Sequence, residues 1–317
     1  YESGWEPVIS ATRGWARSTC FHKGRLIFGG LSSRPQTMLF SVISEFFNFD
    51  LGSGLDDEAI DITIDDDKVN AINAVFSGNG LQIFTSGGEY TIRSSINDAL
   101  TPTTAASQLT RETTNGSGNI LPSVPRQTPR PVSVDGATAF ANIEGTTIHQ
   151  FIFNETESSF NSPRLSELSG HLINKPLSMD IRKANEDHPS DYLYVVNEDG
   201  TCAVMNSLRE QSLLAWSLFE THGKFEDVAV SGNKTYFIVS RTVNGATVRY
   251  LERLNADHYT DSSILQSNVT ATNSWTGYGH LDTETLKVRG DDFIYDDTIP
   301  VGGTITISDT ANKVEAG

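Results

Sequence analysis

The stretch TYFIVSRTVNGATVRYLERL, residues 235–254, contains a β-hairpin in its plainest form. Runs of β-branched and aromatic residues lie on both sides of Asn244-Gly245. Asn-Gly supplies the positive φ angles of a type I′ turn, whose twist matches that of the two strands it joins. The stretch therefore predicts two antiparallel strands connected at Asn244 and Gly245.

The same unit recurs along the chain. Four further pairs of apolar runs are separated by short breaks: RLIFGG with MLFSVISEFFNF (25–49), LQIFTSGGEYTIRS (81–94), ATAFANIEGTTIHQFIFN (137–154) and YLYVVNEDGTCAVMNS (192–207). The units follow each other at intervals of roughly 45–57 residues, a spacing typical of stacked repeats or propeller blades. A single hairpin buries too little apolar surface, so the copies must pack face to face. We predict an all-β fold with a propeller-like core of repeated antiparallel hairpins.

Two segments inside this core read differently. SPRLSELSGHLI predicts a short helix over 163–173, because Pro163 suits a first helical turn and the leucines recur at helical spacing. Residues 101–131 hold few large apolar residues, three arginines and no lysine. We interpret 101–131 as a long loop, and such loops usually have a function or are disordered. It is a candidate gate or contact loop, with the residues Arg111, Arg126 and Arg130.

The pattern changes again near the C-terminus. We expect the propeller-like domain to cover 1–264 and a small β module to begin over 265–317, where short alternating strands flank Asp291-Asp292 and Gly302-Gly303. We also expect the chain to continue beyond Gly317. QSLLAWSLFE (211–220) follows a hairpin directly and is interpreted as a strand.

Composition excludes several classes of function. The formal charge of −17 argues against tight nucleic-acid binding, which needs lysine and arginine to neutralise phosphates. No apolar run approaches the ~18 residues of a membrane-spanning helix, so we predict no membrane insertion. Cys20 and Cys202 lie too far apart for a zinc motif or a disulfide framework, and we expect free, buried thiols. No nucleophile elbow, phosphate loop or dinucleotide fingerprint occurs, and we predict no catalytic, cofactor-binding or metal-binding residue.

The densest group of charges is DDEAIDITIDDD (56–67), with seven carboxylates in twelve residues. Calcium binding is one interpretation, but the ligand order of an EF-hand is missing. The alternation of Ile60, Ile62 and Ile64 instead predicts a strand whose acids face water. Earlier in the chain, 24–50 crowds aromatic residues together, which is typical of a core between sheets. We assign to that core Leu26, Phe28, Phe40, Phe47 and Phe49.

Several phrases occur in a characteristic order: GWARSTCFHKGRLIFGG, SRPQTMLFSVISEFFNFD, VNAINAVFSGNGLQIFTSGGEYTI and DYLYVVNEDGTCAVMNSLREQSLLAWSLFETHGKFEDVAV. Together they resemble the tail nozzle family of short-tailed phages and prophages, also called tail tubular protein B. The resemblance runs from about residue 5 to the end. The Arg- and Pro-rich segment 101–131 departs from it.

The resemblance implies a structural virion protein with no enzymatic activity and no cofactor. It implies a homohexamer at the distal end of a short tail, assembled in the host bacterial cytoplasm. Its expected partners are the adaptor ring of the head–tail connector and the tail fibres or spikes. The ring would retain packaged double-stranded DNA and conduct it during ejection without binding it specifically. We expect the channel to be lined by Asp56, Asp57, Glu58, Asp65, Asp66 and Asp67.

Two other classes stay open. A carbohydrate- or receptor-binding propeller, or one that degrades glycans, would present exposed tryptophan and tyrosine beside paired carboxylates. A structural scaffold outside phage biology would need none of these features.

Overall fold

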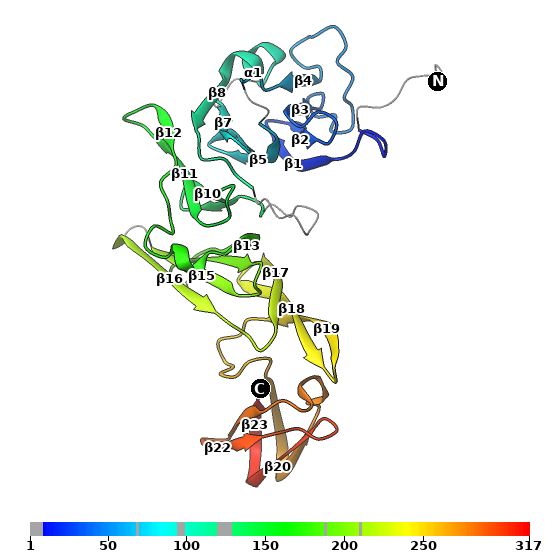
Figure 1. Cartoon of the computed structure of the whole chain (residues 1–317), viewed down its shortest axis with the longest axis vertical. Helices are drawn as coiled ribbons and strands as arrows, with labels where there is room; N and C mark the ends of the chain where they lie inside the picture. The colour runs from blue at the N-terminus through cyan, green and yellow to red at the C-terminus, as the bar shows by residue number, and fades with distance from the viewer. Residues whose placement is uncertain (1–8, 68–69, 94–98, 119–128, 187–188, 209–210) are drawn as a thin grey trace. The chain divides into compact units, whose positions relative to one another are not determined.

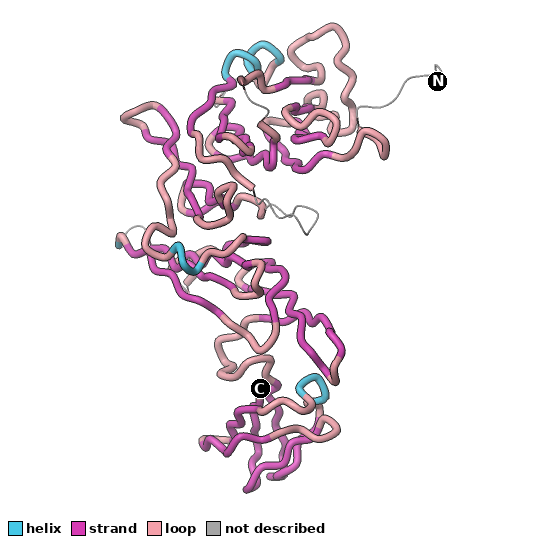
Figure 2. The backbone as a smooth tube through the Cα atoms, in the orientation of Figure 1, coloured by secondary structure: helices cyan, strands magenta, loops and turns pink. Residues whose placement is uncertain are grey.

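The computed structural model describes residues 9–67, 70–93, 99–118, 129–186, 189–208 and 211–317. Strands account for most of its regular structure (Figure 2). The chain forms two compact units: Tyr1–Glu198 with Ala203–Ser217, and Asp199–Cys202 with Leu218–Gly317. The predicted all-β, propeller-like fold is confirmed, since the chain builds one small antiparallel sheet after another (Figure 1).

In the first unit, consecutive strands of the chain are neighbours in each sheet, as in propeller blades. The first sheet contains β1 (Ala16–His22), β2 (Arg25–Leu31), β3 (Thr37–Phe40) and β4 (Ile60–Thr63). The second contains β5 (Ile72–Gly78), β6 (Gly80–Thr85), β7 (Gly88–Ile92) and β8 (Leu109–Thr113). The third contains β9 (Val132–Val134), β10 (Ala137–Ala141), β11 (Ile148–Asn154) and β12 (Ser159–Asn161). The fourth contains β13 (Pro176–Arg182), β14 (Asp191–Asn197), β15 (Cys202–Leu208) and β16 (Leu213–Phe219).

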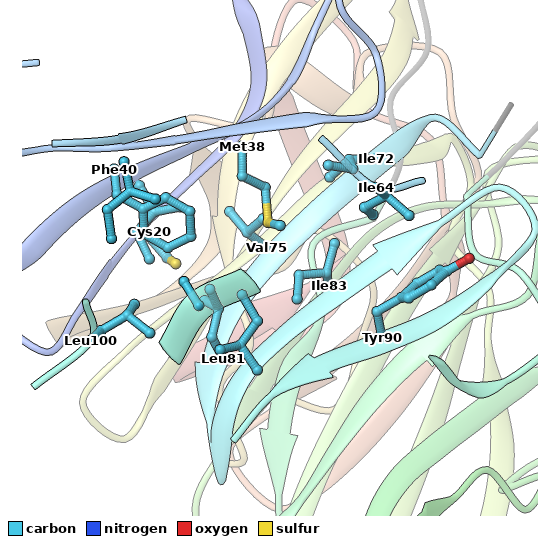
Figure 3. Packing of buried hydrophobic residues seen from close by; sticks show 14 residues of the cluster. Cys20, Met38, Phe40, Ile64, Ile72, Val75, Leu81, Ile83, Tyr90 and Leu100 are labelled. Atoms are coloured by element: carbon cyan, nitrogen blue, oxygen red, sulfur yellow. The ribbon is translucent and has the colours of Figure 1, made fainter. Parts of the chain in front are cut away.

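The cores of the first unit lie between successive sheets. The first two sheets share a cluster that includes Met38, Phe40 and Val75 (Figure 3). Phenylalanines join the second sheet to the third, where the rings of Phe84 and Phe140 lie 4.9 Å apart. A third cluster joins the third sheet to the fourth. The predicted face-to-face packing of hairpins is therefore present.

The second unit holds two sheets. The first contains β17 (Lys224–Ser231), β18 (Lys234–Val243) and β19 (Ala246–Arg253). The second contains β20 (Ile264–Thr276), β21 (Leu286–Gly290), β22 (Phe293–Thr298) and β23 (Thr304–Ala316), with β23 between β20 and β21. The predicted turn joins β18 to β19, with φ of 50° at Asn244 and 77° at Gly245. The boundary predicted at 264/265 falls at the start of β20. The boundary between the two compact units instead lies near residue 218.

The helix predicted over 163–173 is wrong. Only η1 (Gly170–Leu172), a single 3₁₀ turn, forms there. Leu165 N donates to the carbonyl oxygen of Ile148 at 2.8 Å, so the backbone pairs with β11 instead of coiling. The indole of Trp216 donates to the carbonyl oxygen of Leu165 at 3.0 Å and fixes the segment further. The leucines recur at helical spacing, but Leu168 is 93% exposed.

The loop predicted over 101–131 is wrong in its first third. It begins with helix α1 (Pro102–Gln108), and β8 follows directly. Thr101 and Thr104 form a reciprocal capping box, with Pro102 in the first turn. The described remainder has no further strand or helix up to residue 118, and 119–128 lie outside the described residues.

One of the predicted core aromatics is also wrong. Phe40 is fully buried and Leu26 nearly so, whereas Phe47 is 94% exposed. Phe28 and Phe49 stack on each other at 5.3 Å but stay half-buried. The reason is local, because β3 ends at Phe40 and the following residues form a turn instead of a longer strand.

Candidate functional site: two groups of acids at the ends of β4

The acidic run is divided by the short strand β4. Ile60 and Ile64 are buried and anchor the strand, which pairs with β3 at the edge of the first sheet. Asp61 lies within β4 and forms a two-pronged ion pair with Arg34, at 2.7 and 2.9 Å. Residues 56–58 therefore precede the strand and 65–67 follow it, which makes two separate acidic groups.

A buried arginine holds the backbone of the first group, residues 56–58, in place. Arg25 has no exposed surface, and it donates to the carbonyl oxygens of Asp56 at 2.8 Å and Glu58 at 2.6 Å. The Glu58 carboxylate turns back and accepts from Gly54 N at 2.5 Å and Leu55 N at 2.7 Å. Glu58 is thus engaged in its own loop, while Asp56 and Asp57 are exposed to solvent.

The second group is fixed through Asp66. Its carboxylate accepts from the Tyr90 hydroxyl at 2.5 Å, from Asn70 Nδ2 at 2.9 Å and from Arg111 Nη1 at 3.1 Å. The hydrogen bond from Tyr90 contributes most to holding the pKa of Asp66 below its usual range. Asp66 therefore ties 65–67 to the second sheet, and its neighbours Asp65 and Asp67 stay exposed.

Arg111 was predicted to lie in a long loop, but in the structure it belongs to a strand. Arg111 lies on β8, where it also donates to the carbonyl oxygen of Gly87 at 2.6 Å and covers the ring of Tyr90 at 5.9 Å. Arg126 lies outside the described residues. Arg130 is exposed and lines a hollow of about 200 Å³ with Arg17 and Asn73.

Sequence reasoning placed Arg111 and Asp66 in two different functional elements, yet they form an ion pair. No local pattern connects residues that lie 45 positions apart. Sequence reasoning also missed Arg25, whose only signal is a basic residue at the start of an apolar run.

This arrangement presents negative charge on a rigid support. Asp56 and Asp57 before β4, and Asp65 and Asp67 after it, lie on backbone that buried side chains hold in place. Within the described ranges, no group of three or more His, Cys, Asp or Glu side chains is placed to hold a metal ion. Such a surface repels polyanions over about one Debye length, ~8–10 Å at physiological salt.

The second unit contains a different kind of site, a cavity of about 440 Å³ lined in part by Tyr250, Glu252, His258 and Asp261. Both carboxylates bind the buried guanidinium of Arg241, Glu252 at 2.6 Å and Asp261 at 3.0 Å. Burial alone would raise the pKa of Asp261, but hydrogen bonds from Arg241 and His222 N hold it below its usual value. The two carboxylates thus bind one buried guanidinium between them.

Among the described residues, no helix has both the length and the apolar character needed to cross a membrane.

No protein-family model and no curated protein match the chain. Among solved structures, a protein from Lactobacillus plantarum is similar at 11% identity, over 95% of this chain and 88% of that chain, with a TM-score of 0.43. BBS1N in complex with ARL6DN is similar at 13% identity and a TM-score of 0.38, and the match covers 68% of this chain but only 58% of that chain. A luciferin-regenerating enzyme is similar at 13% identity, over 72% and 84% of the two chains, with a TM-score of 0.33. The fold assignment rests on the sheets described above.

Proposed function

We propose that this chain is a tail nozzle protein of a short-tailed phage or prophage, a structural component that makes and breaks no bond. The ordered phrases quoted from the sequence support this function. So does the succession of small antiparallel sheets in the first unit, which fits the propeller-like fold expected of a tail nozzle. The observation that carries the proposal is the pair of exposed acidic groups held at both ends of β4.

The proposed mechanism is electrostatic and steric. DNA carries one negative charge per ~1.7 Å of its axis, and a wall of carboxylates offers it no counterion-releasing contact. Asp56, Asp57, Asp65 and Asp67 are the acids proposed to face the DNA. Because their backbone is anchored, they cannot fold away when DNA approaches. Glu58 and Asp66 act as positioning residues in this scheme, and Arg111 holds Asp66.

The proposed assembly is a ring of six copies around an axial channel, at the distal end of a short tail. Above it the ring would meet the adaptor of the head–tail connector, and at its side the tail fibres or spikes. It would retain the packaged double-stranded DNA and conduct it during ejection, without specific binding and without entering a membrane.

The test replaces all four proposed channel acids by asparagine in the parent phage and measures the rate of genome release from purified particles. The proposal predicts slower release, because DNA would then adhere to the neutralised wall. The matched control replaces four acids exposed elsewhere: Glu144, Glu155, Glu186 and Glu220, each by glutamine. Equal release rates in the two variants would count against the channel role.

A further inference from the structure

We infer that the first sheet carries a docking site for a partner protein. The site is the aromatic tip, defined as Phe21, Phe46 and Phe47, and the partner is one that presents an apolar surface flanked by lysine or arginine. This site would exist whether or not the chain belongs to a phage tail.

The aromatic tip is unusually exposed. Phe47 is 94% exposed, Phe21 63% and Phe46 37%, and the rings of Phe21 and Phe46 meet edge to face at 5.1 Å. The following loop adds Leu51 and Leu55, which are 49% and 60% exposed. Single exposed apolar residues are common, but several on one short segment mark an interaction surface. Aromatic side chains are also the residues that most often dominate binding energy at interfaces.

The tip is held in shape before any partner arrives. Val42 N donates to the carbonyl oxygen of Asn48 at 2.8 Å, and Asn48 Nδ2 donates to the Glu45 carboxylate at 2.8 Å. Ser44, which has a φ of 63°, donates its N–H to the carbonyl oxygen of Gly24 at 2.8 Å. The turn is therefore closed on itself and tied to the β1–β2 connection, which reduces the entropy lost on binding.

The base of the same loop is fixed by Arg25. Besides its bonds to residues 56 and 58, Arg25 donates to the carbonyl oxygen of Ser41 at 2.6 Å. Ile43 N donates to the carbonyl oxygen of Asp57 at 3.0 Å, which joins the two arms of the loop. A phenylalanine that is nearly fully exposed on a loop fixed at both ends has no core to fill within its own sheet.

The charges around the aromatic tip indicate which kind of partner it would bind. Exposed acids flank the tip in the sequence, and Lys23 is the basic residue among them. These acids are Glu45, Asp50, Asp56 and Asp57. A second copy docking through the same face would place acid against acid, and an anionic bilayer would be repelled in the same way. A protein surface that is apolar at its centre and basic at its rim is complementary on both counts.

The experiment measures binding of the full chain to a fluorescent fourteen-residue peptide of leucine and lysine with one apolar face. Two probes serve as references: the same peptide with glutamate for lysine, and one with serine for leucine. We expect binding of the leucine–lysine peptide alone. Phe47→Ser should weaken it at least tenfold, and Asp56→Asn with Asp57→Asn should weaken it at low salt but not at 0.5 M salt.

The matched control is Leu168→Ser, which removes a side chain that is 93% exposed in the connection between β12 and β13 and should leave binding unchanged. Circular dichroism of each variant verifies folding. Equal losses for Phe47→Ser and Leu168→Ser would overturn the inference, as would equal binding of the glutamate peptide. Two further results would overturn it: Phe47-dependent binding to vesicles of phosphatidylcholine and phosphatidylglycerol, or self-association in sedimentation that Phe47→Ser abolishes.

Discussion

The guanidinium of Arg25 donates to the carbonyl oxygen of Glu58 at 2.6 Å, although the two residues lie on opposite sides of a long surface loop. The same side chain reaches the carbonyl oxygens of Ser41, Asp56 and Leu100. In the part of the chain that the structure describes, the hydrogen bonds of this guanidinium go to carbonyl oxygens, and the nearby charge of Asp57 also favours the buried cation. This one residue therefore supports both the first acidic group and the aromatic tip.

Arg25→Leu should lower the free energy of unfolding by about 3–5 kcal/mol, because it leaves several buried carbonyl oxygens without a donor. Arg25→Lys should restore part of this loss, since an ammonium group has at most three donors where the guanidinium has five. Urea unfolding followed by tryptophan fluorescence measures both. Equal stability of the leucine variant and the wild type would show that the guanidinium does not hold the loop.

Two glycines with similar φ angles, 71° at Gly30 and 77° at Gly245, should respond differently to replacement by alanine. A Cβ at Gly30 would lie 2.2 Å from the carbonyl oxygen of Ile72, whereas at Gly245 it would meet nothing within 4 Å. Both have positive φ, so Gly245→Ala should cost only the conformational term of about 1–2 kcal/mol. Gly30→Ala should cost about 3 kcal/mol or more, because it also pushes the first two sheets apart. Matching unfolding midpoints for the two variants would contradict this packing.

Stability should depend on pH through His22. Burial, followed by the nearby charge of Lys23, lowers the pKa of His22 from 6.5 to about 4. Between these values the unfolded chain binds the proton and the folded chain does not. His22 therefore does not lower the free energy of unfolding above about pH 6.5. As the pH falls toward 4, the free energy of unfolding decreases by at most about 3 kcal/mol, because the unfolded chain takes up the proton first. Urea unfolding at a series of pH values should give a shallower dependence for His22→Asn, and an unchanged dependence would refute the assignment.

The two thiols should be inert in the folded protein. Burial raises the pKa of Cys20 to about 12, so almost no reactive thiolate is present near neutral pH. Cys202 is fully buried on β15. A colorimetric disulfide reagent should modify neither thiol in buffer and both in denaturant. Rapid modification of one thiol without denaturant would mean that its sheet opens locally.

The hairpins were predictable because their signals are local. Asn244-Gly245 and Asp199-Gly200 each combine a turn preference with β-forming residues on both sides, and no distant contact has to be known. The strand through Trp216 was predictable for the same reason, since it follows a hairpin directly. These units fix the fold class.

The errors arose where distant partners decide the outcome. Leu165 and Leu168 recur at helical spacing, but the edge of β11 offered their segment a better hydrogen-bonding partner. Phe47 is a residue type that is usually buried, but it lies in a turn closed by backbone hydrogen bonds. These hydrogen bonds cannot be recognised in the sequence. The acids of 56–67 were identified as one run, whereas their division by β4 and their support by Arg25 and Arg111 depend on tertiary contacts.

The most direct measurement for the proposed function is electron microscopy of the parent particle, with this protein labelled by gold through a tag. A nozzle predicts gold at the distal end of the tail, with up to six labels around the tail axis. Gold on the capsid shell, or particles that contain none of the protein, would contradict the account.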